Sequence, residues 1–383
     1  MRKKSRCLLL ASALVVAATT VSAQSGKLPE AKRAELEAAV SKFMAANGVA
    51  GMSVAVVEDG EFAWSQGFGM ADLENSVPAT SSTLYRLGSV SKTITATAAM
   101  ELWENGKIDL DAPVQRYCPA FPEKPWPITT REVLGHLGGI RHYKVTEGAK
   151  PEDDPEIGNT AHFDDPIPAG LRFFASDPLI AQPGTKYHYS TQGFTLVGCA
   201  MEGASREKYV DLVRESVFVP AGMSETQADD RFKIVADRTR FYQKDKSGAI
   251  VNADFLDSSY KIPGGGWLSS ADDLAKFEVA LLNDRLVKRH TRDVMWTPQK
   301  TLDGKLTSYG LGWGVGKIAG VADVGHSGGQ QGTSTYILMV PEQRDGVVVL
   351  INMEDMEAGT LGKQLMQIVL GAPVGNQVKS QTQ

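Results

Sequence analysis

The sequence is poor in cysteine, histidine and long apolar runs, and each shortage excludes a class of protein. Its 383 residues include three cysteines and six histidines, with no C-x-x-C pair and no cysteine–histidine cluster at the spacing of a zinc site. Beyond the N-terminus, no apolar segment is long enough for a transmembrane helix. We therefore expect no metal, no organic cofactor and no stable insertion into a membrane.

Dense basic runs are also missing. The formal charge is -5 at pH 7, and a chain of this kind is a poor partner for nucleic acid or anionic lipid. Hydrophobic residues make up 42% and charged residues 22%, which is typical of a soluble globular protein. The length allows one large domain with two lobes, or two domains.

The N-terminal segment is the one long apolar feature. Residues 1–6 are basic, residues 7–18 are apolar, and small residues end at Ala23. This order predicts a secretory signal peptide over 1–23, cleaved after Ala23, because the apolar run is short for a membrane anchor. Cleavage removes four positive charges and moves the formal charge from -5 to -9. We expect an exported protein, periplasmic or secreted.

Cys118 and Cys199 remain in the mature chain. An oxidising compartment allows one disulfide between them. Cys199 lies in an apolar run, FTLVGCAM, which is typical of a buried small hydrophobe. We favour that unpaired interpretation and leave the disulfide open.

Apolar periodicity predicts strands at both ends of the chain and helices between them. The expected helices are 30–46, 89–105, 129–137 with Thr130 as cap, 191–204, 206–218, one capped by Ser269 or Ser270 that runs to 283, and 358–370. The expected strands are 52–57, 61–67, 309–318, 321–326, 333–340 and 346–352. This order predicts an α+β fold, an antiparallel sheet flanked by helices, with an inserted helical lobe. We place the sheet lobe at about 28–85 and 265–375, and the helical lobe at about 86–264.

Ser89 and Lys92 carry the first candidate chemistry. They lie three residues apart at the start of a predicted helix, so their side chains share one face. A serine hydroxyl needs a base to become a nucleophile, and a desolvated lysine near a helix N-terminus can be that base. Gly88 allows another segment or a substrate to approach closely. Alone, the pattern S-x-x-K is weak, and the two residues are more often a helix cap and a solvated charge.

Two further segments can complete a site. A turn over 183–189 presents Tyr189 just before a helix, and a phenol near cations can accept or pass a proton. The segment 324–329, VGHSGG, leaves a predicted strand. Polar side chains and free backbone N–H groups at such a strand end can bind a substrate and its oxyanion.

Two other serine patterns compete with this site. A second S-x-x-K, from Ser258 to Lys261, precedes Pro263 and a glycine run, so it cannot open a long helix. We attribute it to chance. Residues 325–329 match the nucleophile elbow G-x-S-x-G, with Ser327 as nucleophile. A strand rather than a helix is predicted to follow it, and no histidine comes later in the chain, so we reject this alternative.

The other histidines are interpreted as structural. His136 and His142 flank a Gly-Gly turn rather than lying at helical spacing, and no nearby carboxylate completes a metal site. The same interpretation covers His162, His188 and His290.

In their order along the chain, the three segments resemble the serine beta-lactamase and penicillin-binding-protein family, whose signature begins S-x-x-K and ends K-T-G. The similarity covers nearly all of the mature chain and is strongest toward the class C beta-lactamase branch and its relatives. The supporting runs are YRLGSVSK at 85–92, PGT at 183–185, YST at 189–191, GGGWLSS at 264–270 and YGLGW at 309–313. The run GGIRHY at 138–143, taken with YST, also resembles the mitochondrial beta-lactamase-like serine protease.

The resemblance implies the roles of a serine acyl-transfer site. Ser89 would be acylated and Lys92 would take its proton. Tyr189 would relay that proton to the leaving group and activate the deacylating water. The backbone N–H groups of Ser89 and Gly329 would bind the oxyanion.

The resemblance also places Thr191, His326, Ser327 and Gly328 along the substrate, with His326 and Ser327 holding its far end. Two of them depart from the family pattern. The second motif usually ends in asparagine, and Thr191 loses an amide that would contact the lysine and a substrate amide. The third usually begins with lysine, whereas His326 is only partly charged near neutral pH and would grip a carboxylate less firmly.

These departures favour an ester or a peptide over a beta-lactam as substrate. The sequence thus predicts a serine hydrolase that forms an acyl-enzyme with a small-molecule or peptide substrate. Alternatives of the same kind are a class C-type beta-lactamase and a D-alanyl-D-alanine carboxypeptidase. An alternative of another class is a non-catalytic domain that senses peptidoglycan or a ligand. The oligomeric state stays open.

Overall fold

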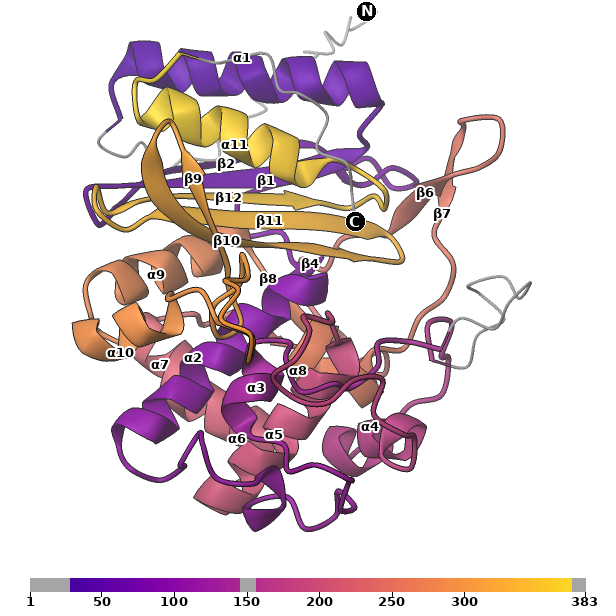
Figure 1. Cartoon of the computed structure of the whole chain (residues 1–383). Helices are drawn as coiled ribbons and strands as arrows, with labels where there is room; N and C mark the ends of the chain where they lie inside the picture. The colour runs from indigo at the N-terminus through magenta and orange to yellow at the C-terminus, as the bar shows by residue number, and fades with distance from the viewer. Residues whose placement is uncertain (1–27, 145–155, 374–383) are drawn as a thin grey trace, which may run out of the picture.

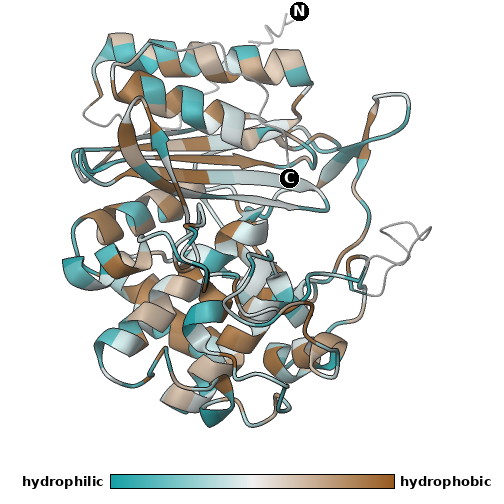
Figure 2. Ribbon diagram, viewed as in Figure 1, coloured by the Kyte–Doolittle hydropathy of each residue, from teal (hydrophilic) through white to brown (hydrophobic). Residues whose placement is uncertain are grey.

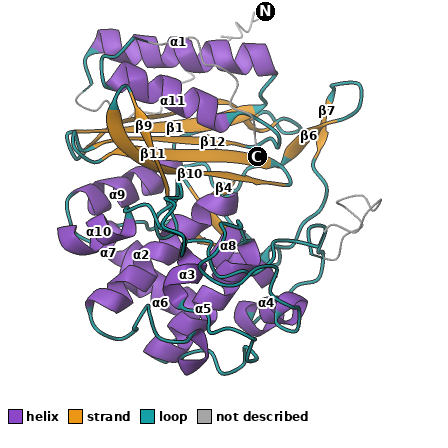
Figure 3. Ribbon diagram, viewed as in Figure 1, coloured by secondary structure: helices purple, strands orange, loops and turns teal. Residues whose placement is uncertain are grey.

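The computed structural model describes residues 28–144 and 156–373. A seven-stranded sheet lies between two groups of helices, and the larger group forms the lower half of the molecule in Figure 1. This arrangement confirms the predicted α+β class, and Figure 3 shows the strands of the central sheet in one layer. The signal peptide over 1–23, with its cleavage after Ala23, stays a prediction because it lies outside the described residues. The two lobe boundaries also stay predictions.

The central sheet is built from both ends of the chain. Its strand order is β3-β2-β1-β12-β11-β10-β9, and its pairings are antiparallel. At the centre, Val54 lies opposite Val349 and Val56 opposite Val347, so branched side chains pack across the strands. The strands are β1 (Gly51–Glu58), β2 (Glu61–Asp72), β3 (Val77–Pro78), β9 (Gly314–Ile318), β10 (Val321–Gln330), β11 (Thr333–Val340) and β12 (Asp345–Ile351).

Helices α1 (Glu30–Asn47) and α11 (Ala358–Val369) cover one face of the sheet. The buried residues of α11 include Leu361, Leu365 and Ile368, whose spacing of three and four keeps them on one side of the helix. They pack against the strands in a core that is separate from the core of the other face. Figure 2 shows the hydrophobic residues running along these central strands.

The other face of the sheet packs against α9 (Ala271–Leu282), and α2 (Ser91–Glu104) lies in the helical layer next to it. Helix α2 is buried on nearly all sides, as expected of a helix at the centre of a core. The remaining helices are α3 (Thr130–Leu134), α4 (Pro166–Phe174), α5 (Thr191–Ser205), α6 (Tyr209–Val213), α7 (Val219–Ala221), α8 (Ile262–Gly265) and α10 (Arg289–Met295).

Short strands connect the sheet to the helical lobe. Strand β8 (Trp267–Ser269) pairs with β4 (Tyr85–Arg86) and with β5 (Gln227–Ala228). A separate hairpin joins β6 (Tyr242–Lys244) to β7 (Ile250–Asn252). Strand β4 ends at Arg86, so its pairing with β8 fixes the place at which the turn at Gly88–Val90 begins.

Several predicted element boundaries were wrong. The expected strand 309–318 begins only at Gly314, whereas the strand expected to end at 326 continues to Gln330 because β11 pairs with it throughout. The expected helix 206–218 is interrupted by a π-helical turn over Arg214–Phe218. Helix α3 is capped by Thr129, which forms a capping box with Glu132, rather than by Thr130.

The favoured interpretation of Cys199 was also wrong. Cys118 and Cys199 form a disulfide across 81 residues of sequence, with their Cα atoms 5.4 Å apart. Both side chains are buried, so the apolar context of Cys199 was real but did not exclude a bond. Closing a loop of this length stabilises the fold by about 4 kcal/mol in the chain-entropy account.

Within the described ranges, no helix combines the length and the apolar character needed to span a membrane.

Candidate active site

Ser89 lies in a one-turn 3-10 helix, Gly88–Val90, which precedes α2. The predicted helix over 89–105 therefore begins two residues later, at Ser91. Gly88 has φ +50°, and a Cβ there would lie 2.8 Å from the backbone nitrogen of Gly329. The glycine is needed both for its left-handed backbone and for the close approach of β10. The expected role of Gly88 is confirmed by this contact.

Lys92 lies next to Ser89 with three polar contacts. Its Nζ is 2.9 Å from Ser89 Oγ, 3.0 Å from Thr191 Oγ1 and 2.7 Å from the carbonyl oxygen of Gly264. The side chain is completely buried. Burial lowers the pKa of Lys92 well below its ordinary value, and the nearby charge of Lys261 lowers it further.

The three polar contacts of Lys92 match the two donors and the one lone pair of a neutral amine. An uncharged amine has two N–H donors and one lone pair. The carbonyl of Gly264 and the hydroxyl of Thr191 can take the two donors, which leaves the lone pair for the O–H of Ser89. A general base and a serine nucleophile need an arrangement of this kind.

Tyr189 faces the same pair of residues. Its hydroxyl is hydrogen-bonded to Ser89, and Lys92 Nζ lies 4.9 Å from the centre of its ring. Burial raises the pKa of Tyr189 well above its ordinary value, and the bond to Ser89 offsets only part of this. The resting side chain is therefore a phenol, which can donate a proton but is not yet a base.

Two histidines hold the segment that carries Tyr189. The backbone N–H of Ser190 donates to His136 Nδ1 and that of Thr191 donates to His142 Nδ1, each over 3.1 Å. These N–H groups lie at the start of α5, where the helix offers no acceptor of its own. The ring of His136 lies 4.3 Å from that of Tyr189, centre to centre.

Both histidines are neutral in this environment. Burial lowers the pKa of His142 to about 3 and that of His136 well below its ordinary value. Both accept hydrogen bonds from the backbone, which agrees with the structural role predicted for them. The sequence analysis missed their contact with the site. For His142 the available signal was the run GGIRHY at 138–143, which the resemblance pairs with YST at 189–191, whereas His136 lies outside that run.

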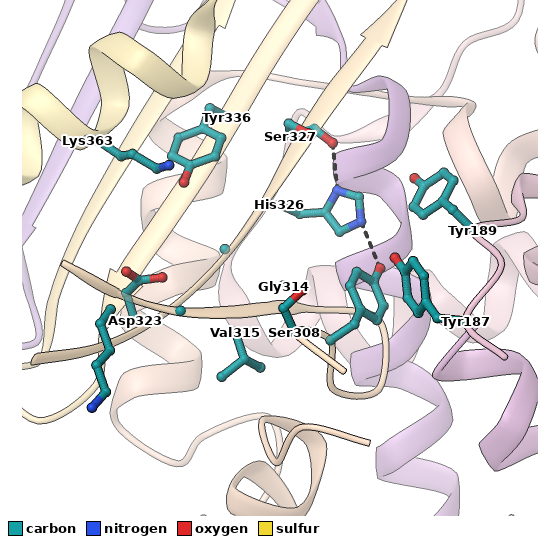
Figure 4. A pocket seen from close by; sticks show the side chains of 14 residues that line it. Tyr187, Tyr189, Ser308, Gly314, Val315, Asp323, His326, Ser327, Tyr336 and Lys363 are labelled. Carbon is teal, nitrogen blue, oxygen red and sulfur yellow. Dashed lines mark hydrogen bonds between the residues drawn. The ribbon is translucent and has the colours of Figure 1, made fainter. Parts of the chain in front are cut away.

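His326 is buried and lies in the wall of the pocket that Figure 4 shows. Its Nε2 accepts a hydrogen bond from the hydroxyl of Tyr309 at 2.8 Å, and its Nδ1 donates to the carbonyl of Ser327 at 2.6 Å. Burial lowers the pKa of His326 to about 3. The ring is thus neutral with both nitrogens engaged, rather than the partly charged group expected to hold a substrate.

Ser327, Gly328 and Gly329 lie along β10 beside Ser89. The Ser327 side chain is exposed. A Cβ on Gly328 would lie 3.1 Å from the backbone nitrogen of Ser89, so the strand and the turn that carries Ser89 are in direct contact. The backbone nitrogens of Ser89 and Gly329 therefore both lie at this contact between the turn and the strand. Because β11 follows Ser327 rather than a helix, the elbow alternative has no structural support.

The second S-x-x-K also lies close to this site, which the sequence analysis did not predict. Ser258 Oγ has no hydrogen-bond partner in the part of the chain that the structure describes. Lys261 is 3% exposed and lies 5.4 Å from the ring centre of Tyr143. Burial lowers the pKa of Lys261 to about 7, and the charge of Arg86 contributes. The two residues form no dyad, but the charge of Lys261 acts on Lys92.

Residues 28–144 and 156–373 contain no group of three or more potential metal ligands. The site consists of Ser89, the buried Lys92 and the phenol of Tyr189, with strand β10 beside them. Residues 36–369 match the family described as Beta-lactamase. The chain belongs to this family. The family is one of serine hydrolases with this fold.

Individual relatives agree with that assignment. The mouse (Mus musculus) mitochondrial serine beta-lactamase-like protein LACTB is 32% identical over 79% of this chain and 71% of its own length. A D-aminopeptidase of Gluconobacter oxydans is 28% identical over 89% of this chain and 62% of its own length. Among solved structures, the octameric penicillin-binding protein homologue from Pyrococcus abyssi superposes with a TM-score of 0.74 at 28% identity, covering 89% of this chain and 78% of that one.

Proposed function

We propose that this beta-lactamase-family protein is a serine hydrolase that acylates Ser89 and acts on an ester or a peptide. The observation that supports this most is the contact of 2.9 Å between Lys92 Nζ and Ser89 Oγ in a buried environment. Burial favours the neutral amine, which can accept the serine proton.

Acylation follows from this arrangement. Ser89 Oγ attacks the substrate carbonyl while its proton moves to Lys92, and the backbone N–H groups of Ser89 and Gly329 stabilise the oxyanion. When the tetrahedral adduct collapses, Tyr189 gives its phenolic proton to the leaving group. The phenolate that results lies against the new ammonium of Lys92, which stabilises it.

Deacylation reverses the proton transfers. The Tyr189 phenolate takes a proton from a water molecule, and the hydroxide attacks the acyl carbon. Ser89 Oγ leaves and takes its proton back from Lys92. Each group returns to its starting state, so the cycle consumes one water and needs no cofactor.

The contacts of His326 support an ester or peptide over a beta-lactam. A carboxylate that lies along β10 would meet a neutral ring whose nitrogens already bond Tyr309 and the Ser327 carbonyl. The cation that the family pattern usually supplies there is missing. We expected Thr191 to lose the contact with the lysine that the family's asparagine makes. Its hydroxyl does contact Lys92.

The test is labelling and turnover in matched variants. We expect the mature protein to hydrolyse a short-chain nitrophenyl ester faster than a chromogenic cephalosporin, and a fluorophosphonate to label Ser89 in peptide mapping. Ser89→Ala should lose the label and at least about a thousandfold in kcat/KM. Ser258→Ala, a serine of the same motif with no bonded partner, should keep both. Full hydrolysis by Ser89→Ala would exclude the proposal.

We further propose that the protein is exported to an oxidising compartment. The predicted signal peptide over 1–23 supports this, and so does the disulfide between Cys118 and Cys199, because such bonds persist mainly outside the cytosol. Intact mass of the protein from its native host tests it. A mature chain that begins at Gln24 and lacks free thiols is expected, and a chain that keeps residues 1–23 with free thiols at all three cysteines would contradict it.

A further inference from the structure

The hydrogen bonds of Lys92 continue beyond Thr191. The hydroxyl of Tyr143 is hydrogen-bonded to the side chains of Thr191 and Tyr260. The hydroxyl of Tyr260 donates in turn to the backbone carbonyl of Glu156. Together with the contact of 3.0 Å between Lys92 Nζ and Thr191 Oγ1, these bonds form one chain from the lysine to a backbone carbonyl. The mechanism above gives the two tyrosines no role.

The carbonyl at the end of this chain belongs to a residue that is held in place. The carboxylate of Glu156 accepts hydrogen bonds from both terminal nitrogens of Arg141, at 2.6 and 2.9 Å. It also accepts one of 2.6 Å from the side-chain amide of Gln192, which directly follows Thr191 in the chain. Glu156 is buried. Both ends of the tyrosine pair are therefore tied to the first residues of helix α5.

The carbonyl determines the direction of each hydrogen bond in the chain. A carbonyl oxygen only accepts, and a hydroxyl has one hydrogen to donate. Burial raises the pKa of Tyr143 above its ordinary value, and an ordinary tyrosine titrates at about pH 10, so both phenols are protonated at neutral pH. Because Tyr260 donates to the carbonyl, it accepts from Tyr143. Tyr143 in turn accepts from Thr191, whose oxygen then accepts from Lys92.

This direction controls where the lone pair of Lys92 points. Thr191 and the carbonyl of Gly264 each take one N–H of the neutral amine, so the lone pair faces the third contact, Ser89 Oγ at 2.9 Å. Without an acceptor for its own hydrogen, the hydroxyl of Thr191 would donate to that lone pair. The amine would then turn an N–H toward Ser89, and an N–H cannot take the serine proton.

We propose that Tyr143 and Tyr260 are positioning residues for the base Lys92. They act through the hydroxyl of Thr191, whose direction they fix, and so keep the lone pair of the lysine directed at Ser89. This inference rests on the proposed acyl transfer at Ser89 and deepens it. When Lys92 accepts the serine proton, the ammonium keeps its other contacts, so no hydrogen bond in the chain has to reverse during the reaction.

Removing one phenol hydroxyl at a time tests this inference. For Tyr143→Phe we expect kcat/KM for a short-chain nitrophenyl ester to fall by about tenfold, because a hydrogen bond from Thr191 then competes for the lone pair. Tyr260→Phe should lower it less, because Thr191 keeps Tyr143 as an acceptor. Tyr242→Phe is the matched control and should leave kcat/KM unchanged. Its hydroxyl is also hydrogen-bonded, to the backbone N–H of Leu73, but it belongs to the core on the other face of the sheet.

The same substitution in two Thr191 backgrounds separates positioning from a general loss of structure. Valine has no hydroxyl that can turn toward Lys92, so in Thr191→Val the further change Tyr143→Phe should lower kcat/KM by less than about twofold. Thr191→Ser keeps a hydroxyl and should retain the full effect of Tyr143→Phe. Each rate is divided by the number of sites that a fluorophosphonate labels at completion, so that unfolded protein does not count.

The results separate this inference from the function on which it rests. Turnover that does not need Ser89 removes both. Ser89-dependent turnover that Tyr143→Phe leaves unchanged, or a loss in Tyr143→Phe that persists in the Thr191→Val background, overturns the positioning role alone. A loss that Thr191→Val abolishes and Thr191→Ser retains is the expected result.

Discussion

The chain contains the pattern S-x-x-K twice, and the two copies have different surroundings. Ser89 and Lys92 are joined by a contact of 2.9 Å at the start of a long buried helix. Ser258 has no bonded partner in the described part of the chain, and Lys261 lies against the rings of Tyr143 and Tyr260 instead. Two residues at a fixed spacing therefore do not make a catalytic pair by themselves.

The acceptors around each lysine make the difference. Lys92 meets a hydroxyl and a carbonyl that can take its two donors, and so it can be neutral at little cost. Lys261 has no hydrogen-bond acceptor among the described residues, and its charge is instead held near aromatic faces. One lysine is thus placed to exchange a proton, and the other to influence its neighbour through charge.

Among the substitutions that test this comparison, removing Lys92 should have the largest effect on activity. We expect Lys92→Met to lower kcat/KM for an ester by about a thousandfold to ten-thousandfold, because Tyr189, the other titratable group bonded to Ser89, rests as a protonated phenol and cannot take the serine proton. Lys92→Arg should not restore activity, since a guanidinium does not lose its proton at neutral pH. Steady-state kinetics measures both, and activity within tenfold of the wild type in Lys92→Met would show that Lys92 is not the base.

Removing Lys261 should stabilise the protein, and more so at neutral than at alkaline pH. Burial lowers the pKa of Lys261 to about 7 in the folded state, against about 10.4 in an unfolded chain. Between these values the unfolded chain binds more protons, so stability rises with pH, while below about 7 the full cost of the buried charge remains. We expect Lys261→Met to raise the free energy of unfolding by about 1–4 kcal/mol at pH 6.5.

Urea unfolding at pH 6.5 and pH 10 checks this expectation. The gain should shrink at pH 10, where the folded protein carries a neutral Lys261 and the unfolded chain is only partly charged. Lys305→Met is the control, because its side chain is 82% exposed and such substitutions change stability by less than about 0.5 kcal/mol. A loss of stability in Lys261→Met at both pH values would contradict the expected stabilisation.

The contrast between the two copies also shows what the sequence could predict. The strands at 52–57 and 346–352 were predictable because each is a short apolar run whose neighbours mark its ends. The contact of Ser89 with Lys92 was predictable because a spacing of three residues puts both side chains on one helix face. The approach of Tyr189 was an implication of the family resemblance, which rests on the order of three motifs.

Long-range contacts account for what the sequence did not show. The bond between Cys118 and Cys199 joins segments 81 residues apart, and an apolar context suits a paired cysteine as well as a free one. His326 is turned inward because the hydroxyl of Tyr309 reaches its Nε2. Lys261 is buried because the whole 3-10 turn at Ser259–Lys261 lies inside the protein. None of these contacts has a period or a spacing in the sequence.

Replacing Ser258 should have the smallest effect of these substitutions. It tests whether the second S-x-x-K takes any part in catalysis. Ser258→Ala removes a buried hydroxyl that has no partner in the described ranges, so no hydrogen bond is lost and an unfavourable burial is relieved. We expect the free energy of unfolding to change by less than about 1 kcal/mol, toward greater stability, and kcat/KM to stay within about twofold. Urea unfolding and ester kinetics on the same preparation measure both. A tenfold fall in kcat/KM with unchanged stability would mean that the second copy takes part in catalysis.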